Sequence, residues 1–124
     1  MGALLAQFEG KKYLSIETYR KSGDPVRTPV WFVEDNGLLY VRTADSTGKY
    51  KRIRNNPAVK IAPCDIRGNV KGDWLAAEAS VAPASEADEA YRLLRKKYGM
   101  MYAVTTAFMR GKSYVVLKIR ANDQ

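Results

Sequence analysis

The 124-residue sequence contains no histidine, a single cysteine and fewer acidic than basic residues. Without histidine, the chain cannot build a histidine-ligated metal site or a serine–histidine or cysteine–histidine catalytic pair. Cys64 has no second cysteine with which to form an intramolecular disulfide, which favours the reducing cytoplasm as its location. Chemistry near neutral pH would therefore come from a bound cofactor, or from carboxylate, tyrosine or lysine groups with shifted pKa values.

Long hydrophobic runs are also missing. No apolar segment reaches the roughly 18 residues that a membrane-spanning helix needs. Residues 1–13 have only a short apolar patch and no leading basic region, so we expect no signal peptide there. The composition, 46% hydrophobic and 27% charged, is typical of folded globular proteins. We therefore predict one domain, residues 1–124, around a single core.

The charge balance is strongly basic. Lysine and arginine number 21 against 13 acidic residues, for a net charge of +8. This balance favours an anionic partner such as nucleic acid, anionic lipid or a phosphorylated small molecule. The basic residues concentrate between Arg42 and Arg54, where the only acid is Asp45. A solvated basic surface without a ligand is the alternative interpretation. The basic residues of this segment are Arg42, Lys49, Lys51, Arg52 and Arg54.

Alternating apolar and polar residues predict a mainly β protein, a small β-barrel with short α-helices. Asp35-Asn36-Gly37 predicts a tight hairpin, because Asn-Gly tolerates the positive φ angles of a type I′ turn. Pro29 cannot donate a ladder hydrogen bond, so its strand is interrupted there, lies at an edge or leaves one side open. Short turns between the strands favour an antiparallel sheet. The six predicted strands are 13–19, 26–35, 38–43, 58–66, 70–82 and 112–120.

Helical patterns are fewer. A short basic helix is predicted from Gly48 to the stop at Asn56-Pro57, with Tyr50 and Ile53 facing inward. A longer helix is predicted between Ser85, where a capping-box-like start occurs, and Gly99, a natural C′ residue. Residues 3–9 can form one or two helical turns, and residues 100–110 stay unassigned.

The start of the basic helix combines features suited to a phosphate group. Hydroxyl groups can donate to phosphate oxygens, and a glycine allows close approach of the backbone. The first N–H groups of the helix carry the positive end of its dipole. The G-x-x-x-x-G-K-[ST] pattern of a Walker loop is absent. The groups concerned are the hydroxyls of Thr43, Ser46 and Thr47, the backbone of Gly48, and the cations Arg42 and Lys49.

Several segments, in this order and spacing, resemble a known family. They are Thr-Pro-Val-Trp-Phe from Thr28, Tyr-Val-Arg-Thr from Tyr40, Ser-x-x-Lys-x-x-Arg-Ile-Arg-Asn-Asn-Pro from Ser46, and Ala-Pro-Cys from Ala62. Together they look like the pyridoxamine 5′-phosphate oxidase-like split β-barrel superfamily, in its branch of flavin- or deazaflavin-dependent oxidoreductases. The resemblance is dense from residue 13 to residue 72 and thin after residue 82.

The resemblance implies a six-stranded antiparallel split barrel of the FMN-binding type. It implies a homodimer with the cofactor, coenzyme F420 or FMN, in a groove between the subunits. By motif position, one group of residues would hold the phosphate, a second would follow the ring system, and a third would lie nearby. Lys51, Arg52 and Arg54 would suit the long anionic tail of F420, and they would equally suit a solvated helix surface. The residues implied are Arg42, Thr43, Ser46 and Lys49 for the phosphate, Pro29, Val30 and Trp31 for the rings, and Ala62, Pro63 and Cys64 beside them. Thr28, which begins the ring motif, is also expected to bind the cofactor.

The function implied is transfer of hydride between reduced F420 and a small-molecule acceptor, with the hydride supplied by the cofactor. No catalytic side chain is assigned, and no metal is expected. The alternatives are an FMN-binding reductase and a flavin-binding carrier or sensor without turnover. A more distant alternative is a nucleic-acid-binding barrel. This last class is disfavoured, because most aromatic residues alternate with apolar ones as core residues do.

Overall fold

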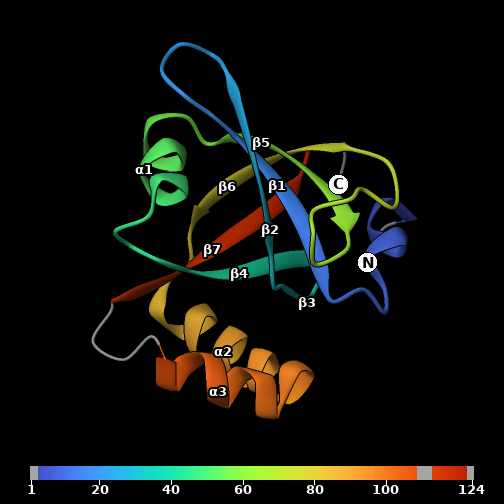
Figure 1. Ribbon diagram of the computed structural model, residues 1–124, viewed down its shortest axis with the longest axis vertical. Coiled ribbons are helices and arrows are strands. Elements are labelled where there is room, and N and C mark those ends of the chain that lie inside the picture. The colour runs from blue at the N-terminus through green and yellow to red at the C-terminus, as the bar shows by residue number, and fades with distance from the viewer. Residues whose placement is uncertain (1–2, 109–112, 123–124) are drawn as a thin grey trace.

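One antiparallel sheet dominates the computed structural model, which describes residues 3–108 and 113–122. Within these residues the sheet has seven strands in the order β2-β1-β5-β6-β7-β4-β3 (Figure 1). The sheet curls into a barrel, so the mainly β prediction is confirmed. The strands are β1 (Tyr13–Tyr19), β2 (Pro25–Val30), β3 (Val33–Asp35), β4 (Leu38–Ala44), β5 (Ala58–Cys64), β6 (Leu75–Val81) and β7 (Tyr114–Ala121).

The strand predicted at 26–35 is two strands, which raises the count from six to seven. β2 pairs with β1 and β3 pairs with β4, at opposite edges of the sheet. The chain therefore crosses from one edge to the other through Trp31 and Phe32. The backbone of Phe32 bonds outside the ladder: its N–H donates to the Tyr98 hydroxyl and its carbonyl accepts from Lys97. These contacts with a distant segment explain the break.

The edge position of β2 accounts for Pro29. Pro29 lies opposite Ser15 of β1, and β2 has no other neighbour in the sheet. Its missing N–H therefore interrupts no ladder, in agreement with one of the three possibilities for this proline. The hairpin after β3 is also confirmed, since Asn36 and Gly37 have φ angles of 53° and 79°, as a type I′ turn requires.

The strand predicted at 70–82 is shorter than expected. β6 begins at Leu75, and residues 65–74 form a loop attached to the end of β5 by a single bridge between Cys64 and Val70. The Asp65 carboxylate accepts from the backbone N–H groups of Arg67 and Asn69 and thereby shapes the turn. Ala77 and Ala79 of β6 point into the barrel core, so their small size serves packing within this chain.

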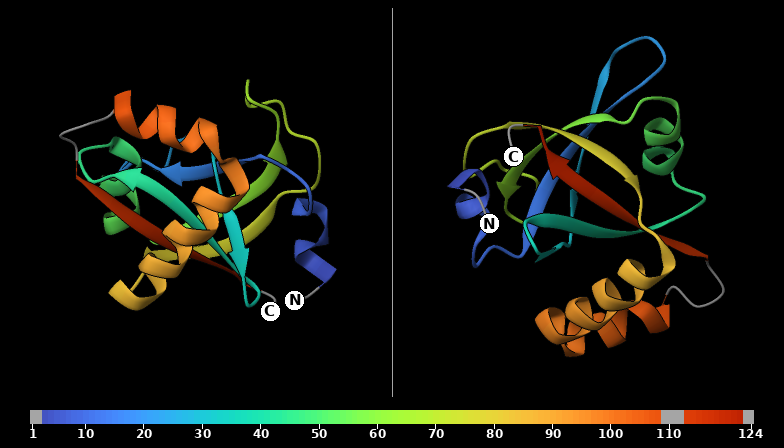
Figure 2. Two further views of the ribbon diagram at one scale, coloured as in Figure 1. Left: turned by 90° about the horizontal axis from the view of Figure 1, so that it is seen from below. Right: turned by 180° about the vertical axis from the view of Figure 1, so that it is seen from behind.

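Four helical segments surround the sheet. The 3-10 helix η1 (Ala3–Phe8) and helix α1 (Gly48–Asn55) lie at opposite ends of the barrel (Figure 2). The boundaries of α1 agree with the prediction. α2 (Ala84–Tyr98) begins after Pro83 without a side-chain cap, so the predicted cap at Ser85 is wrong by two positions.

α3 (Met100–Phe108) occupies most of the segment that had no assignment. Residues 109–112, which include the predicted start of the last strand, lie outside the described residues. No helix in residues 3–108 or 113–122 is long and apolar enough to cross a membrane.

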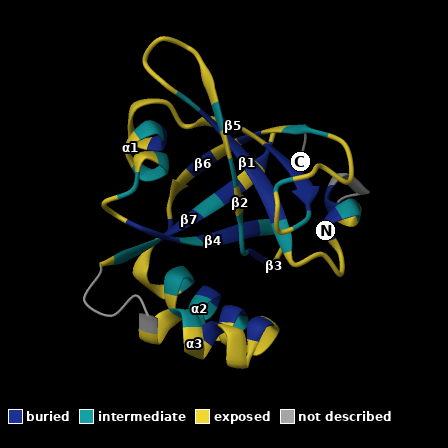
Figure 3. Ribbon diagram, in the orientation of Figure 1, coloured by how far each residue is buried: buried dark blue, intermediate teal, exposed yellow. Residues whose placement is uncertain are grey.

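The buried side chains form two clusters, one on each side of the sheet. Inside the barrel, Leu14, Ile16 and Leu117 pack with Ile53 from α1 and Phe8 from η1. Outside it, α2 packs against β3, β4 and β7, and α3 lies beside α2 (Figure 3). β4 serves both clusters, because its alternate residues face opposite sides. Leu39 and Val41 face the barrel core, whereas Tyr40 joins the helix layer.

Candidate functional site

A hollow of about 190 Å³ lies where the β2–β3 linker, the end of β4, the start of α1 and the start of β7 meet. It brings together five of the predicted cofactor residues, from three separate segments of the sequence. These are Val30, Trp31, Arg42, Thr43 and Lys49; Ala44, Thr47 and Tyr114 complete the lining.

Two threonine hydroxyls form the base of the hollow. Thr47 Oγ1 donates to the carbonyl of Ala44 at 2.8 Å and accepts from the N–H of Tyr50 at 3.3 Å. The Thr43 and Thr47 hydroxyls are 3.2 Å apart. Because Thr47 donates its only hydroxyl proton to the Ala44 carbonyl, Thr43 must be the donor in the hydrogen bond between the two hydroxyls. The pair thus anchors the end of β4 to the N-cap of α1.

The start of α1 faces the same hollow. Thr47 side-chain and backbone oxygens accept from the N–H groups of Tyr50 and Lys51. The N–H groups of Gly48 and Lys49 then have no acceptor within the helix. The Lys49 pKa is lowered, first by burial and second by the neighbouring Arg52 charge. The site therefore combines backbone donors with a partly desolvated ammonium.

Arg42 approaches the hollow from β4 and is held by aromatic rings. Its guanidinium carbon lies 4.6 Å from the ring centroid of Tyr102 and 4.8 Å from that of Tyr114. Its Nη1 donates to Thr106 Oγ1 at 3.0 Å. Stacking on aromatic faces suits arginine and leaves its other donors free for an anion. Among the described residues, neither Arg42 nor Lys49 forms an ion pair with a carboxylate.

Trp31 reaches the hollow from the β2–β3 linker and stacks on Tyr98 of α2. The Tyr98 hydroxyl lies 2.7 Å from the carbonyl of Lys12 and 3.0 Å from both the N–H and the carbonyl of Phe32. Burial raises the pKa of Tyr98 well above its ordinary value. Tyr98 is therefore a neutral structural group at physiological pH.

Lys97, next to Tyr98, holds the same linker. Its ammonium donates to the carbonyl of Phe32 at 2.8 Å and lies 3.7 Å from the centre of the Phe32 ring. Burial of the ammonium lowers the pKa of Lys97 to about 8. Two consecutive residues of α2 thus determine where the linker, and with it Trp31, lies.

Several predicted residues lie outside the hollow. Ser46 is exposed in the turn before α1. Lys51 is exposed and lies with Arg54 and Asn55 on another side of the helix. Thr28 is half-buried opposite Ile16, and Pro29 is exposed on the edge strand.

The β5 segment is buried rather than open to a ligand. Ala62 is completely buried, Pro63 is less than 2% exposed and Cys64 is 5% exposed. Ala62 lies in line with Pro29 across β1, since both are opposite Ser15. β1 therefore separates these two predicted cofactor residues by one strand. The pKa of Cys64 is raised, first by burial and second by Asp65, so its thiol is protonated at neutral pH.

Trp74 forms a lid on the outer face of the sheet beside β2. The guanidinium of Arg27 on β2 lies 4.7 Å from the ring centroid of Trp74, which immediately precedes β6. β1 and β5 separate β2 from β6 in the sheet. The contact therefore places Trp74 above the outer face of these two strands, where Ser15 and Ala62 are buried.

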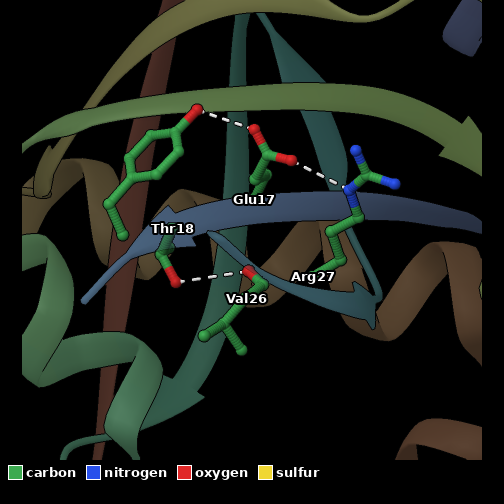
Figure 4. Close-up of polar contacts among 5 residues, drawn as sticks. Glu17, Thr18, Val26 and Arg27 are labelled. Atoms are coloured by element: carbon green, nitrogen blue, oxygen red, sulfur yellow. Dashed lines mark hydrogen bonds and ion pairs between the residues drawn. The ribbon is translucent and has the colours of Figure 1, made fainter. Parts of the chain in front are cut away.

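Beside this lid, Glu17 is a buried carboxylate on the outer face of β1. Its oxygens accept from Tyr19 Oη at 2.7 Å and from Arg27 Nε at 2.8 Å (Figure 4). Burial raises the Glu17 pKa, but the hydrogen bonds and the Arg27 charge outweigh it, so the pKa is lowered. Burial and the Glu17 charge raise the pKa of Tyr19 to about 12. The cluster is internally satisfied and stabilises the pairing of β1 with β2.

Sequence reasoning missed parts of the site. It named Thr47 among the hydroxyls suited to phosphate but not as the N-cap of α1, although its position three residues before Tyr50 is a readable N-cap signal. Tyr114 and Ala44 gave no such signal, because they meet only through the pairing of β4 with β7. Trp74, Tyr98 and Tyr102 do not line the hollow: the two tyrosines are core residues and Trp74 covers the sheet.

A family model described as pyridoxamine 5′-phosphate oxidase matches residues 2–123, nearly the whole chain. The chain belongs to the pyridoxamine 5′-phosphate oxidase family. The family resemblance read from the motifs is thereby confirmed, and the curved antiparallel sheet is the split barrel of this family. No curated protein has a significant sequence match to this chain.

Solved structures agree on the fold. The haem storage protein HutZ from Vibrio cholerae has a TM-score of 0.75 at 13% identity, with 96% of this chain and 87% of that chain covered. An F420 reductase has a TM-score of 0.64 at 20% identity, with 98% and 95% covered. An FAD-binding protein from Mesorhizobium loti has a TM-score of 0.66 at 16% identity, with 98% and 89% covered. At these identities, the likeness shows the shared fold and leaves the ligand open.

Proposed function

We propose that this protein binds the phosphate of a flavin-type cofactor, coenzyme F420 or FMN, in the hollow at the start of α1. The observation that carries the proposal is the convergence of Arg42 and Lys49 on one hollow without carboxylate partners among the described residues. Unpaired cations beside a helix start suit a dianionic group such as phosphate. The donor set therefore fits the cofactor class that the family suggests.

Each residue of the hollow would have a distinct role. Lys49 and the N–H groups at the start of α1 would bind phosphate oxygens, and Arg42 would add charge from the opposite wall. The Thr43–Thr47 pair would keep the end of β4 and α1 in register. Trp31, fixed by Tyr98, would border the ring system. The cofactor would supply the hydride chemistry, while the protein would orient it and exclude water.

We also propose that a second copy of the chain completes the site. The hollow is about 190 Å³, whereas pockets that enclose a drug-sized ligand typically measure about 300–1,000 Å³. β2 is an edge strand whose residues are alternately exposed and half-buried. A homodimer with the cofactor in the groove between subunits would cover both this edge and the open side of the hollow.

The activity we propose is hydride transfer between reduced F420 and a small-molecule acceptor in the cytoplasm. An FMN-dependent reductase and a flavin-binding carrier are the alternatives on the same site. A haem group held by a proximal histidine, as in many haem proteins, is incompatible with a chain that has no histidine.

The test begins with the visible spectrum of the purified protein, followed by titration with FMN and with F420. Binding of one of them in a defined ratio to dimer, measured by fluorescence and light scattering, is the expected result. Turnover of a reduced cofactor with added acceptors then separates an enzyme from a carrier. The proposal is wrong if neither cofactor binds while single-stranded oligonucleotides bind in a salt-sensitive way.

A further inference from the structure

Three cations lie together at α1 without a counter-charge. They are Lys49, Arg52 and Arg20, the last at the end of β1. None of them belongs to an ion pair among the described residues. The pKa of Lys49 is lowered by burial and then by Arg52, and the pKa of Arg52 is lowered by burial and then by Arg20. Lys49 and Arg52 lie three residues apart on α1, and Arg20 lies two residues after Thr18 of β1, to which Arg52 is hydrogen-bonded.

Arg52 is held in place by a hydrogen bond to β1. Its Nε donates to Thr18 Oγ1 at 2.7 Å. The Thr18 hydroxyl in turn points to the carbonyl of Val26 (Figure 4). One donor of the guanidinium is thereby used for positioning. No described residue accepts a hydrogen bond from Nη1 or Nη2 of Arg52. The guanidinium fork, which can bind an oxyanion in a bidentate way, is therefore available.

The free fork lies at the start of α1, beside the hollow. A Cβ added to Gly48 would lie 2.7 Å from Arg52 Nη1 and 3.9 Å from Nη2. Only glycine at this position allows the guanidinium to fold back against the first turn of the helix. Arg52 does not line the hollow itself, whereas the flanking residues Thr47 and Lys49 do. The fork is therefore adjacent to the hollow but outside it.

We propose that Arg52, together with Lys49 and Arg20, forms a second anion subsite next to the phosphate hollow. This inference rests on the proposed function, and it restricts the cofactor to one with a further negative group close to its phosphate. The diphosphate of a dinucleotide flavin and the carboxylate tail of a deazaflavin both have that chemistry. FMN, with a single phosphate, would leave the fork of Arg52 unused.

The decisive experiment compares Arg52→Gln with Lys96→Gln, a matched loss of one charge at an exposed residue of α2. Affinities for FMN, FAD and F420 are measured by fluorescence titration. The loss of a charge-assisted hydrogen bond predicts that Arg52→Gln weakens FAD or F420 binding about 10- to 100-fold. FMN binding should change by less than about threefold, and Lys96→Gln should affect the binding of no ligand by more than that. The ligand that responds identifies the source of the second anion.

An equal loss for all three ligands, or no loss for any, overturns the proposal. Gly48→Ala provides an independent variant, because it displaces the guanidinium without removing a charge and should reproduce the selective loss. Circular dichroism confirms that both variants are folded.

Inorganic pyrophosphate and phosphate, compared by thermal shift, test the subsite without a flavin. Stabilisation by pyrophosphate that depends on Arg52, in a protein that binds no flavin, supports the subsite and contradicts the proposed function. Equal effects of pyrophosphate and phosphate on the wild type and on Arg52→Gln, without any flavin binding, contradict both.

Discussion

The indole of Trp31 lies parallel to the ring of Tyr98, with centroids 4.3 Å apart and planes 9° from parallel. Trp31 belongs to the linker that joins the two edge strands of the barrel, and Tyr98 ends α2. The contact therefore connects the outer helix layer to the wall of the candidate cofactor site. Arg42 makes a similar connection to α3 through Tyr102 and Thr106. The helices thus position site residues from the side opposite the barrel core.

Tyr98→Phe tests this connection, because it removes the hydroxyl and retains the stacked ring. The buried N–H of Phe32 loses its acceptor, and an unsatisfied buried donor costs about 1–3 kcal/mol of the free energy of unfolding. Urea denaturation measures the change. Tyr91→Phe is the control, since no described residue hydrogen-bonds to its hydroxyl, and it should shift the free energy by less than about 0.5 kcal/mol. Equal effects of the two variants would contradict the structural role of Tyr98.

Thr47→Ala tests the N-cap of α1. The variant removes the acceptor for the Tyr50 N–H and the partner of the Thr43 hydroxyl. We expect a loss of about 1–2 kcal/mol in the free energy of unfolding. Thr47→Ser, which keeps the oxygen, should retain most of the stability. A serine variant as unstable as the alanine variant would show that the methyl group, rather than the cap, matters.

Lys49→Ala tests the phosphate site directly. Loss of a charge-assisted hydrogen bond should weaken cofactor binding by about 1.5–3 kcal/mol, measured by fluorescence titration. Lys96→Ala, at an exposed residue of α2, should leave the affinity nearly unchanged. An unaltered affinity in a correctly folded Lys49→Ala protein would mean that the phosphate lies elsewhere.

Glu17→Gln tests the buried carboxylate on the outer face. The pKa of Glu17 is lowered from 4.5 in the folded protein, so the folded state favours the charged form. Its contribution to stability is complete well above pH 4.5 and is lost as the pH falls below that value. The difference in the free energy of unfolding between wild type and variant should therefore shrink on acidification. The exposed Glu9→Gln is the control, and a difference independent of pH would be the contrary result.

Local chemistry made some features readable in advance. The hairpin at Asn36-Gly37 depends on two residues that tolerate positive φ angles, and the limits of α1 depend on Thr47 and Asn56-Pro57. Arg42, Thr43 and Lys49, which the sequence groups within eight residues, line one hollow in the structure. The family motifs extended this grouping to Val30 and Trp31.

Contacts between distant segments decided the rest. The break between β2 and β3 depends on hydrogen bonds from Phe32 to Tyr98 and Lys97, more than 60 residues away. The contact of Trp74 with Arg27 reaches across two intervening strands. Tyr114 enters the site only through the register of β4 and β7.

The sequence by itself determined the short-range elements and the basic, phosphate-suited character of residues 42–54, because these follow from neighbouring side chains and backbone preferences. The tertiary structure alone decided that Ser46 and Lys51 lie outside the hollow and that Arg52 turns its free donors toward Gly48. Those positions depend on strand register and helix packing, which are set by the free energy of the whole fold rather than by any one segment.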